Sequence, residues 1–193
     1  IHFIYIRETA EKNLMKAFAG EAQARNRYTY YSEVAKQEGY EQIAGIFLET
    51  AGNELEHARL FFGYLGDKRE VIDFTAAYPI GLGNTVENLE NAFLGEMEEN
   101  TTLYPEYGKT AEEEGFADVA ATFKHILVVE KHHEARYRAL QKNILEDVVF
   151  KRPEAIEWKC RNCGYLMNIP ELPPKCPFCH YPRAFFEISC DNF

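Results

Sequence analysis

The feature that most constrains this chain is a Glu-x-x-His motif that occurs twice, at equivalent positions of an internal repeat. The first copy is Glu54 and His57, and the second is Glu130 and His133, 76 residues further along. The same offset aligns the triplets at 38–40 and 114–116, each an acid, a glycine and an aromatic residue. A repeat of this length predicts two copies of one supersecondary unit. Helix-forming residues are abundant from 8 to 146, so each unit should be a helical hairpin.

Glycine positions divide the hairpins into four long helices. Gly39, Gly66 and Gly115 each follow a periodic stretch, and glycine just past a helix end is the expected stop signal. The predicted helices span residues 8–37, 41–65, 84–113 and 117–146. The segment 67–83 is predicted to be a crossover, because the fold must bring two similar hairpins together. Pro105 lies inside the third helix, where it should kink the helix or remove a hydrogen bond.

Both motifs lie on helix stripes that are otherwise largely apolar. The stripe positions in the second and fourth helices follow the same spacings of three and four residues. They are Ile43, Phe47, Thr50, Glu54, His57 and Phe61 in one helix, and Val119, Phe123, Ile126, Glu130, His133 and Tyr137 in the other. Buried carboxylates need a compensating partner, and a metal cation is the simplest one. His132 points about 100° away from His133 along the helix and is predicted not to be a ligand.

The partner helices offer carboxylates on their own stripes. Glu21 in the first helix and Glu96 in the third are counterparts within the repeat, whereas Ala24 is the counterpart of Glu99. A Glu from each of two helices plus Glu-x-x-His from each of the other two is the arrangement of di-iron and di-manganese carboxylate proteins. Imidazole and carboxylate ligands suit either metal. The sequence therefore predicts six ligands in pseudo-twofold pairs and one extra carboxylate.

Two details of the repeat bear on this site. From the glutamate to the glycine stop there are 18 residues in the first helix but 19 in the third, which predicts a bulge. Tyr28 and Tyr104, about two turns beyond Glu21 and Glu96, could donate hydrogen bonds to ligand carboxylates, or could be ordinary core tyrosines. For the motifs themselves the alternative is surface ion pairs on a polar helix face. Two copies on apolar stripes, with acids on the partner stripes, argue against that alternative.

The last part of the chain has a different composition. Five of the eight prolines fall between 153 and 177, and all five cysteines lie in the final 34 residues. Four cysteines form two C-x-x-C pairs, a pattern that predicts one tetrahedral metal site in a segment too small to hold a core alone: Cys160, Cys163, Cys176 and Cys179. A zinc ribbon has similar spacing and remains open. Cys190 is interpreted as a free thiol.

Charge and hydropathy exclude several classes of partner. The formal net charge is −10 and no basic stripe is present, which argues against nucleic acid. No apolar run approaches the roughly 18 residues that span a bilayer, so no membrane partner is expected. The apolar hexapeptide at residues 1–6 is too short for a signal peptide and is predicted to be an extended arm packed on the body. These features favour a cytoplasmic protein.

The pattern as a whole resembles the rubrerythrin family over almost the entire chain. The matching segments are Glu-Lys-Asn-Leu at 11–14, Ala-Phe-Ala-Gly-Glu-Ala-Gln-Ala-Arg at 17–25, Glu54-x-x-His57, Glu96-x-x-Glu99 followed by Tyr104-Pro105, Glu130-x-x-His133, and the cysteine pairs ending in Pro182-Arg-Ala-Phe-Phe-Glu187. The hexapeptide and Cys190 lie outside this pattern. The resemblance implies a mainly α fold. A ferritin-like four-helix bundle with a crossover would occupy residues 1–150, and a rubredoxin-like four-cysteine domain would occupy residues 151–193.

The resemblance also implies an activity and its cofactors. It implies a non-haem di-iron peroxidase that reduces hydrogen peroxide to water and protects against oxidative stress. Two iron ions would be held by Glu21, Glu54, His57, Glu96, Glu99, Glu130 and His133, and a third by the four paired cysteines, which would relay electrons. In the family one iron moves between a glutamate and a histidine as the redox state changes, here Glu99 and His57. Together with Tyr28 and Tyr104 these two are the predicted catalytic residues.

The resemblance further implies a homodimer and an external electron source. Because no G-x-G-x-x-G dinucleotide fingerprint is present, electrons would arrive from a separate donor protein or reductase. Two other functions remain open on the sequence. One is a ferritin-like ferroxidase that detoxifies iron. The other is an interaction protein with zinc in the four-cysteine site.

Overall fold

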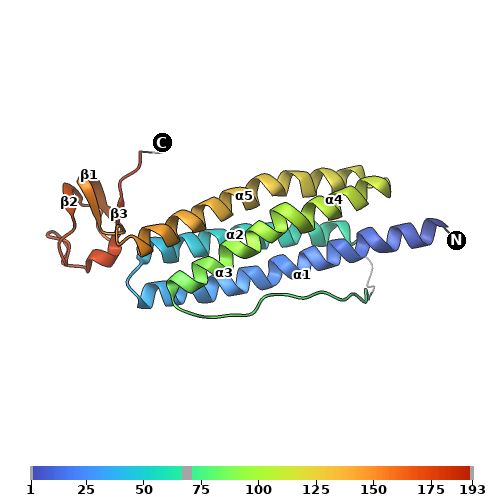
Figure 1. Ribbon diagram of the computed structural model, residues 1–193, viewed down its shortest axis with the longest axis horizontal. Helices are drawn as coiled ribbons and strands as arrows, with labels where there is room; N and C mark the ends of the chain where they lie inside the picture. Colours follow the sequence, from blue (N-terminus) through green and yellow to red (C-terminus); the bar gives the residue numbers. More distant parts are fainter. Residues whose placement is uncertain (1, 67–70, 192–193) are drawn as a thin grey trace.

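The computed structural model describes residues 2–66 and 71–191, with side chains from residue 9 onward. Its main body is a bundle of two antiparallel helical hairpins (Figure 1). The first hairpin is α1 (His2–Gln37) and α2 (Glu41–Tyr64). The second is α3 (Thr85–Glu98), a π-helix η1 (Glu99–Leu103) and α4 (Tyr104–Glu113), which together form one continuous arm, paired with α5 (Ala117–Leu145). The predicted four-helix bundle of two hairpins is confirmed.

The two hairpin turns have the same construction, as the repeat predicts. Gly39 and Gly115 adopt φ angles of +84° and +86°, which glycine reaches without the strain that a Cβ imposes. In each turn the next residue donates its backbone N–H to a carbonyl five positions back: Tyr40 to Ala35 and Phe116 to Ala111. These are the hydrogen bonds of a Schellman stop. The expected glycine stops are therefore confirmed.

A long crossover joins the hairpins, as predicted. From residue 71 it runs in extended form along the length of α1 before α3 begins (Figure 1). Two hydrogen bonds attach it to α1: the Tyr78 hydroxyl donates to the Lys16 carbonyl, and the Tyr31 hydroxyl donates to the Gly81 carbonyl. Asn84 then ends the crossover by capping α3 in a reciprocal capping box with Glu87.

The third arm contains the predicted bulge. Residues Glu99–Leu103 form a π-helix, so each hydrogen bond there encloses one residue more than in an α-helix. Pro105 lies in the first turn of α4, where its missing N–H interrupts the regular α-helical hydrogen bonds. The side chain of Asn100 donates to the Glu96 carbonyl at 2.8 Å and so satisfies one backbone acceptor at the bulge.

The prediction for the start of the chain is wrong. Residues 2–6 belong to α1 and are helical, not an extended arm. What their side chains contact lies outside the described residues. The contrast has a simple source: a six-residue apolar run does not distinguish a strand-like arm from the first turns of a long helix. No helix in the described part of the chain is both long enough and apolar enough to cross a membrane.

The C-terminal residues form a small sheet at one end of the bundle (Figure 1). Strand β1 (Lys151–Cys160) lies between β2 (Leu166–Glu171) and β3 (Phe186–Ile188), all antiparallel, with the short helix η2 (Arg183–Phe185) before β3. Trp158, Leu172 and Phe186 are buried in its core. The division of the chain between residues 150 and 151 remains a prediction.

Close packing attaches this sheet to the bundle. Phe150 stacks on Tyr40 of the first hairpin turn, with ring centroids 6.1 Å apart. The guanidinium of Arg161 lies against α2 at Gly45, where a Cβ would be only 2.7 Å from Nη2 of the arginine. The glycine therefore leaves the room that this contact requires.

Candidate metal centres

The carboxylate–histidine centre lies between two aromatic layers of the bundle. One layer is built around Tyr28, Phe47 and Tyr137, and the other around Phe61 and Phe123. The six polar side chains between these layers come from α1, α2, α3 and α5, and each is at most 7% exposed: Glu21, Glu54, His57, Glu96, Glu130 and His133. The structure thus brings together the six residues that the repeat pairs, although their role as ligands stays a prediction.

One half of the centre surrounds His57. Its Nδ1 atom lies 2.8 Å from Glu54 Oε2, 3.1 Å from Glu130 Oε1 and 3.7 Å from Glu21 Oε2. The ligand atoms of these four residues all lie within 4.8 Å of one another. A single N–H group cannot satisfy three carboxylates, whereas one cation between the four side chains can.

The other half surrounds His133 in the same way. Its Nδ1 atom lies 3.0 Å from Glu130 Oε2, 3.3 Å from Glu54 Oε1 and 3.3 Å from Glu96 Oε2. Glu54 and Glu130 therefore belong to both groups, each offering one oxygen to each histidine. Glu21 and Glu96 belong to one group each. This arrangement fits two metal ions, which Glu54 and Glu130 together would hold in common.

The protonation pattern of the metal-free centre fits a cation site. Burial raises the pKa of Glu21 and of Glu96 well above the usual range, and neighbouring carboxylates raise both further. Burial would lower the pKa of His133, but hydrogen bonds to Glu130, Glu54 and Glu96 raise it to about 12. Three buried carboxylate oxygens of the centre lack a hydrogen bond of good geometry within the described residues: Glu21 Oε2, Glu54 Oε1 and Glu130 Oε1. The centre therefore holds protons where metal ions would bind, and metal uptake would release them.

Two buried tyrosines hold the outer carboxylates. The Tyr28 hydroxyl donates to Glu96 Oε1, and the Tyr104 hydroxyl donates to Glu21 Oε1. Each bond crosses from one hairpin to the other, so the tyrosine of one unit orients the ligand of its counterpart. Burial raises the pKa of both hydroxyls well above the usual range, which keeps them protonated as donors. Both tyrosines thus lie where the sequence places them.

Glu99 occupies a different place from the other acids. It belongs to neither group of four ligands and is only partly buried, at the first position of the π-helix. Its Oε1 atom lies near α1, 3.9 Å from where a Cβ on Gly20 would be. Burial is the main cause that raises the pKa of Glu99, and the nearby charge of Glu21 raises it further. Glu99 therefore adjoins the Glu21 and His57 half of the centre without joining it. His132 is exposed and belongs to neither group.

A pocket connects Glu99 with the surface. It has a volume of about 290 Å³ and lies between α1, the crossover and the π-helix region. Its lining includes Gly20, Tyr78, Gly95, Glu99 and Tyr104. Gly20 and Gly95 add no side chain to this lining, and a Cβ on Gly20 would lie in ordinary contact, 3.6 Å from the Tyr78 ring. The pocket therefore reaches both an acid beside the centre and a tyrosine that contacts a ligand.

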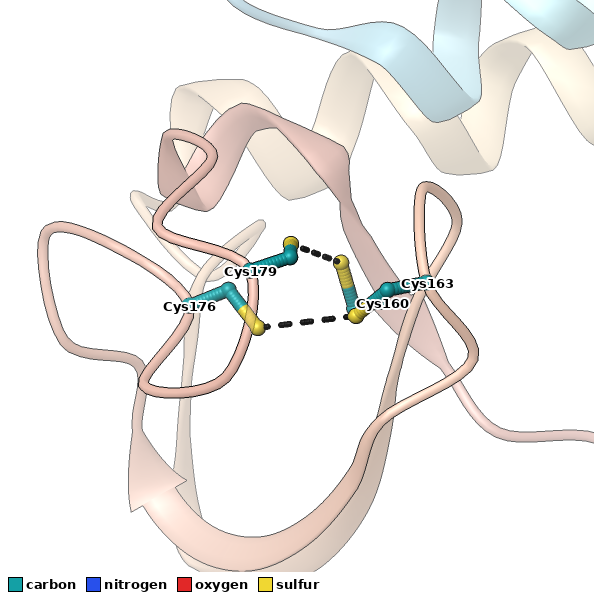
Figure 2. A group of neighbouring side chains, drawn as sticks. All are labelled: Cys160, Cys163, Cys176 and Cys179. Carbon is teal, nitrogen blue, oxygen red and sulfur yellow. Dashed lines mark hydrogen bonds between the residues drawn. The ribbon is translucent and has the colours of Figure 1, made fainter.

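The four paired cysteines converge in the C-terminal domain (Figure 2). The Sγ atoms of Cys160 and Cys179 are 3.8 Å apart, and those of Cys163 and Cys176 are also 3.8 Å apart. These distances are far too long for disulfides. A tetrahedral ion with metal–sulfur bonds of about 2.3 Å needs sulfur atoms about 3.8 Å apart, so the residues fit a four-thiolate metal site.

A backbone hydrogen bond stabilises one thiolate of this site. A hydrogen bond from the backbone N–H of Tyr181 is the main cause that lowers the pKa of Cys179 to about 6. Burial in contrast raises the pKa of Cys163 to about 12 in the absence of a cation. Cys190 is exposed and lies outside the group, as predicted for a free thiol.

The sequence interpretation missed one polar side chain that contacts the centre. Asn53 of α2 places its Oδ1 atom 3.2 Å from Nε2 of His133. A signal for it was present, because Asn53 immediately precedes the ligand candidate Glu54 and the repeat aligns it with an apolar residue, Val129.

Comparisons with known proteins agree with this geometry. The family model described as Rubrerythrin matches residues 12–141, and Rubrerythrin, rubredoxin-like domain, matches residues 158–187. Rubrerythrin-1 of Clostridium acetobutylicum is 54% identical over 189 residues, covering 96% of each chain. Rubrerythrin of Porphyromonas gingivalis is 51% identical over 184 residues, covering 95% of this chain and 91% of the relative.

A solved structure supports the same fold. The fully reduced, all-ferrous state of nigerythrin is 30% identical, with a TM-score of 0.61, and the match covers 93% of this chain and 86% of that chain. A ferritin-like bundle followed by a rubredoxin-like domain is thereby confirmed. The chain carries a carboxylate–histidine centre of the di-iron type and a rubredoxin-like four-cysteine iron site.

Proposed function

Because this chain belongs to the rubrerythrin family, we propose that it is a peroxidase that reduces hydrogen peroxide to water and protects the cell against oxidative stress. Each turnover would consume one peroxide, two electrons and two protons and release two waters. The observation that carries the proposal is the pair of buried ligand groups that share Glu54 and Glu130, beside a pocket that reaches Glu99.

The residues of the centre suit this chemistry. Two ferrous ions, when bound, supply the two electrons that break the O–O bond. Glu54 and Glu130 would bridge them, with His57 and Glu21 completing one position and His133 and Glu96 the other. Tyr28 and Tyr104 hold the outer carboxylates in orientation while the charge of the centre changes. Glu99 stands beside the His57 position as an additional carboxylate.

The pocket under the crossover provides the route for peroxide. Its lining combines the exposed Tyr78 and Glu98 with the less exposed Glu99 and the buried Tyr104, so a small polar molecule that enters it would come beside the His57 half of the centre. The carboxyl of Glu99 can carry a proton there, because burial raises its pKa. The pocket would thus link the surface with a proton carrier that lies beside the Glu21 and His57 half of the centre.

The four-cysteine site would supply the electrons. It lies at one end of the bundle, whereas the carboxylate–histidine centre lies between the aromatic layers within it (Figure 1). We infer that the relay runs between the two subunits of a homodimer, from the four-cysteine iron of one to the di-iron centre of the other. A donor protein or reductase would reduce the four-cysteine iron.

The decisive experiment compares two oxidants. The iron-loaded protein, reduced by an artificial donor, should consume hydrogen peroxide much faster than dioxygen. Consumption of dioxygen without consumption of peroxide would replace the proposal with the ferroxidase alternative. A colourless zinc site in place of a red, reducible iron in the C-terminal domain would contradict the electron relay.

Removing the Glu99 carboxylate should slow turnover without emptying the centre. Glu99→Ala leaves both ligand groups intact, so two ions per chain should remain in the bundle. Peroxide turnover should fall by about 10–100-fold, the range typical of residues that support a metal ligand. Iron analysis and peroxide kinetics measure the two effects. Glu98→Ala is the matched control, since Glu98 lines the same pocket but is exposed. Equal turnover of the two variants would contradict a role for Glu99.

An exposed apolar stripe on α2 is the proposed dimer surface. Leu48, Leu55 and Phe62 are 44%, 46% and 56% exposed and recur at seven-residue spacing, which places them on one helix face. Leu55→Glu should therefore convert the dimer to a monomer in light scattering. Leu94→Glu is the control, because Leu94 is equally exposed on α3. A Leu55→Glu protein that stays dimeric would place the interface elsewhere.

A further inference from the structure

The two histidines of the carboxylate–histidine centre differ in what their outer nitrogens contact. His133 Nε2 lies 3.2 Å from Oδ1 of Asn53. No hydrogen bond to His57 Nε2 occurs among the residues that the structure describes. The inner nitrogens are equivalent, since Nδ1 of each histidine faces three carboxylates. When Nδ1 of a histidine binds a metal, its Nε2 carries the proton. In His133 that N–H donates a hydrogen bond to Asn53 Oδ1.

The repeat explains this difference. Asn53 immediately precedes Glu54 on α2 and reaches across to the histidine of α5. The pseudo-twofold counterpart of Asn53 is Val129, which immediately precedes Glu130 on α5 and would have to reach across to His57. Valine has no hydrogen-bond acceptor. The two hairpins are therefore alike in their ligands but unlike in the group that fixes each ligand.

A second difference between the two halves of the centre concerns the surroundings of His57. The additional acid, Glu99, lies on the α1 side, next to the position of Glu21 and His57. His57 is also 7% exposed, against 1% for His133. The half around His133 thus has a partner for its outer nitrogen, whereas the half around His57 has none among the described residues and has an additional carboxylate beside it.

We propose that Asn53 is a positioning residue that makes the two metal positions unequal, and that Val129 leaves the His57 position adjustable. This inference rests on the proposed two-metal centre but not on the peroxidase activity. Loss of an outer partner of a histidine ligand typically weakens metal binding by about 10–100-fold. The same factor should separate the two positions in the natural protein, with the His133 position the tighter.

Stepwise metal binding tests the proposal. Metal-free full-length protein is titrated with Co²⁺ without oxygen, and d–d absorption reports the carboxylate–histidine centre, while thiolate charge-transfer bands report the four-cysteine site separately. The natural protein should bind two Co²⁺ ions in the centre in unequal steps. Asn53→Val should weaken the tighter step by about 10–100-fold. Val129→Asn should strengthen the weaker step by bringing an acceptor to His57.

Asn53→Asp separates hydrogen bonding from packing. Aspartate keeps an oxygen at the same place, so this variant should retain the tight step. Three results would each overturn the proposal: an unchanged tight step in Asn53→Val, equal weakening in Asn53→Asp, or no effect of Val129→Asn. A natural protein that binds both Co²⁺ ions but reduces no peroxide would refute the peroxidase function and leave this inference standing.

Discussion

Replacing Glu130 by glutamine should empty both metal positions of the bundle. Glu130 belongs to both ligand groups, with one oxygen 3.1 Å from His57 Nδ1 and the other 3.0 Å from His133 Nδ1. An amide supplies only one oxygen and carries no charge, so neither position keeps its anionic bridge. Metal affinity should fall by more than about 100-fold, beyond what outer partners of a ligand contribute. Peroxide turnover should disappear with the metal.

The same substitution should destabilise the metal-free protein. Burial alone would raise the pKa of Glu130, but hydrogen bonds from His133 and His57 outweigh burial and lower it to about 2. Its ionised form therefore compensates the buried histidines. Removing one partner of a buried ion pair typically costs about 3–5 kcal/mol, because the other charge stays buried without compensation. Urea unfolding of the metal-free variant at neutral pH measures this loss.

Glu96→Gln is the matched comparison for this prediction. Glu96 belongs to only one group, and burial raises its pKa well above the usual range, which favours its neutral form in the metal-free protein. Glutamine resembles the protonated acid and can still accept the hydrogen bond of Tyr28. This variant should lose the His133 position but change the unfolding free energy little. If both variants behaved alike in metal content and stability, Glu130 would not be a bridging ligand.

The ligand positions could be predicted because helical periodicity fixes which side chains share a face. Spacings of three and four place Glu54 and His57 on one stripe, and the repeat supplies the second copy. Periodicity does not say which helix a face meets. Tyr28 contacts Glu96 and Tyr104 contacts Glu21, so each contact crosses between the hairpins and depends on how they pack. The sequence therefore predicted how far along the bundle the tyrosines lie, but not which carboxylate each one contacts.

The position of Glu99 is a clearer example of what the sequence alone does not determine. Counting residues predicts one extra residue in the third arm but not where the helix absorbs it. The structure puts the π-helix at Glu99–Leu103, which turns Glu99 away from the ligand groups and restores the register, so that Tyr104 matches Tyr28. Asn100 at the bulge donates to the Glu96 carbonyl of its own arm and also makes a tertiary contact, a hydrogen bond to Glu134 of α5. Such contacts are not encoded in any local pattern.

Removing the four-cysteine metal should unfold the C-terminal domain and leave the bundle intact. The domain core is small, centred on Trp158, Leu172 and Phe186 together with the buried cysteines Cys160 and Cys176. A segment of this size cannot fold on its apolar core alone. Structural metal sites of this kind contribute about 10–16 kcal/mol in small isolated modules. The bundle has separate aromatic layers and does not depend on the cysteines.

The chain carries a built-in probe for this test. Trp158 is its only tryptophan and is fully buried, with its indole N–H donating to the Ile169 carbonyl at 2.9 Å. Cys176→Ser should therefore shift tryptophan emission to longer wavelength, while helical circular dichroism stays nearly unchanged. Cys190→Ser is the control, since Cys190 is exposed and outside the site. Unshifted emission in Cys176→Ser would mean that packing against the bundle, through Phe150 on Tyr40 and Arg161 at Gly45, holds the domain without its metal.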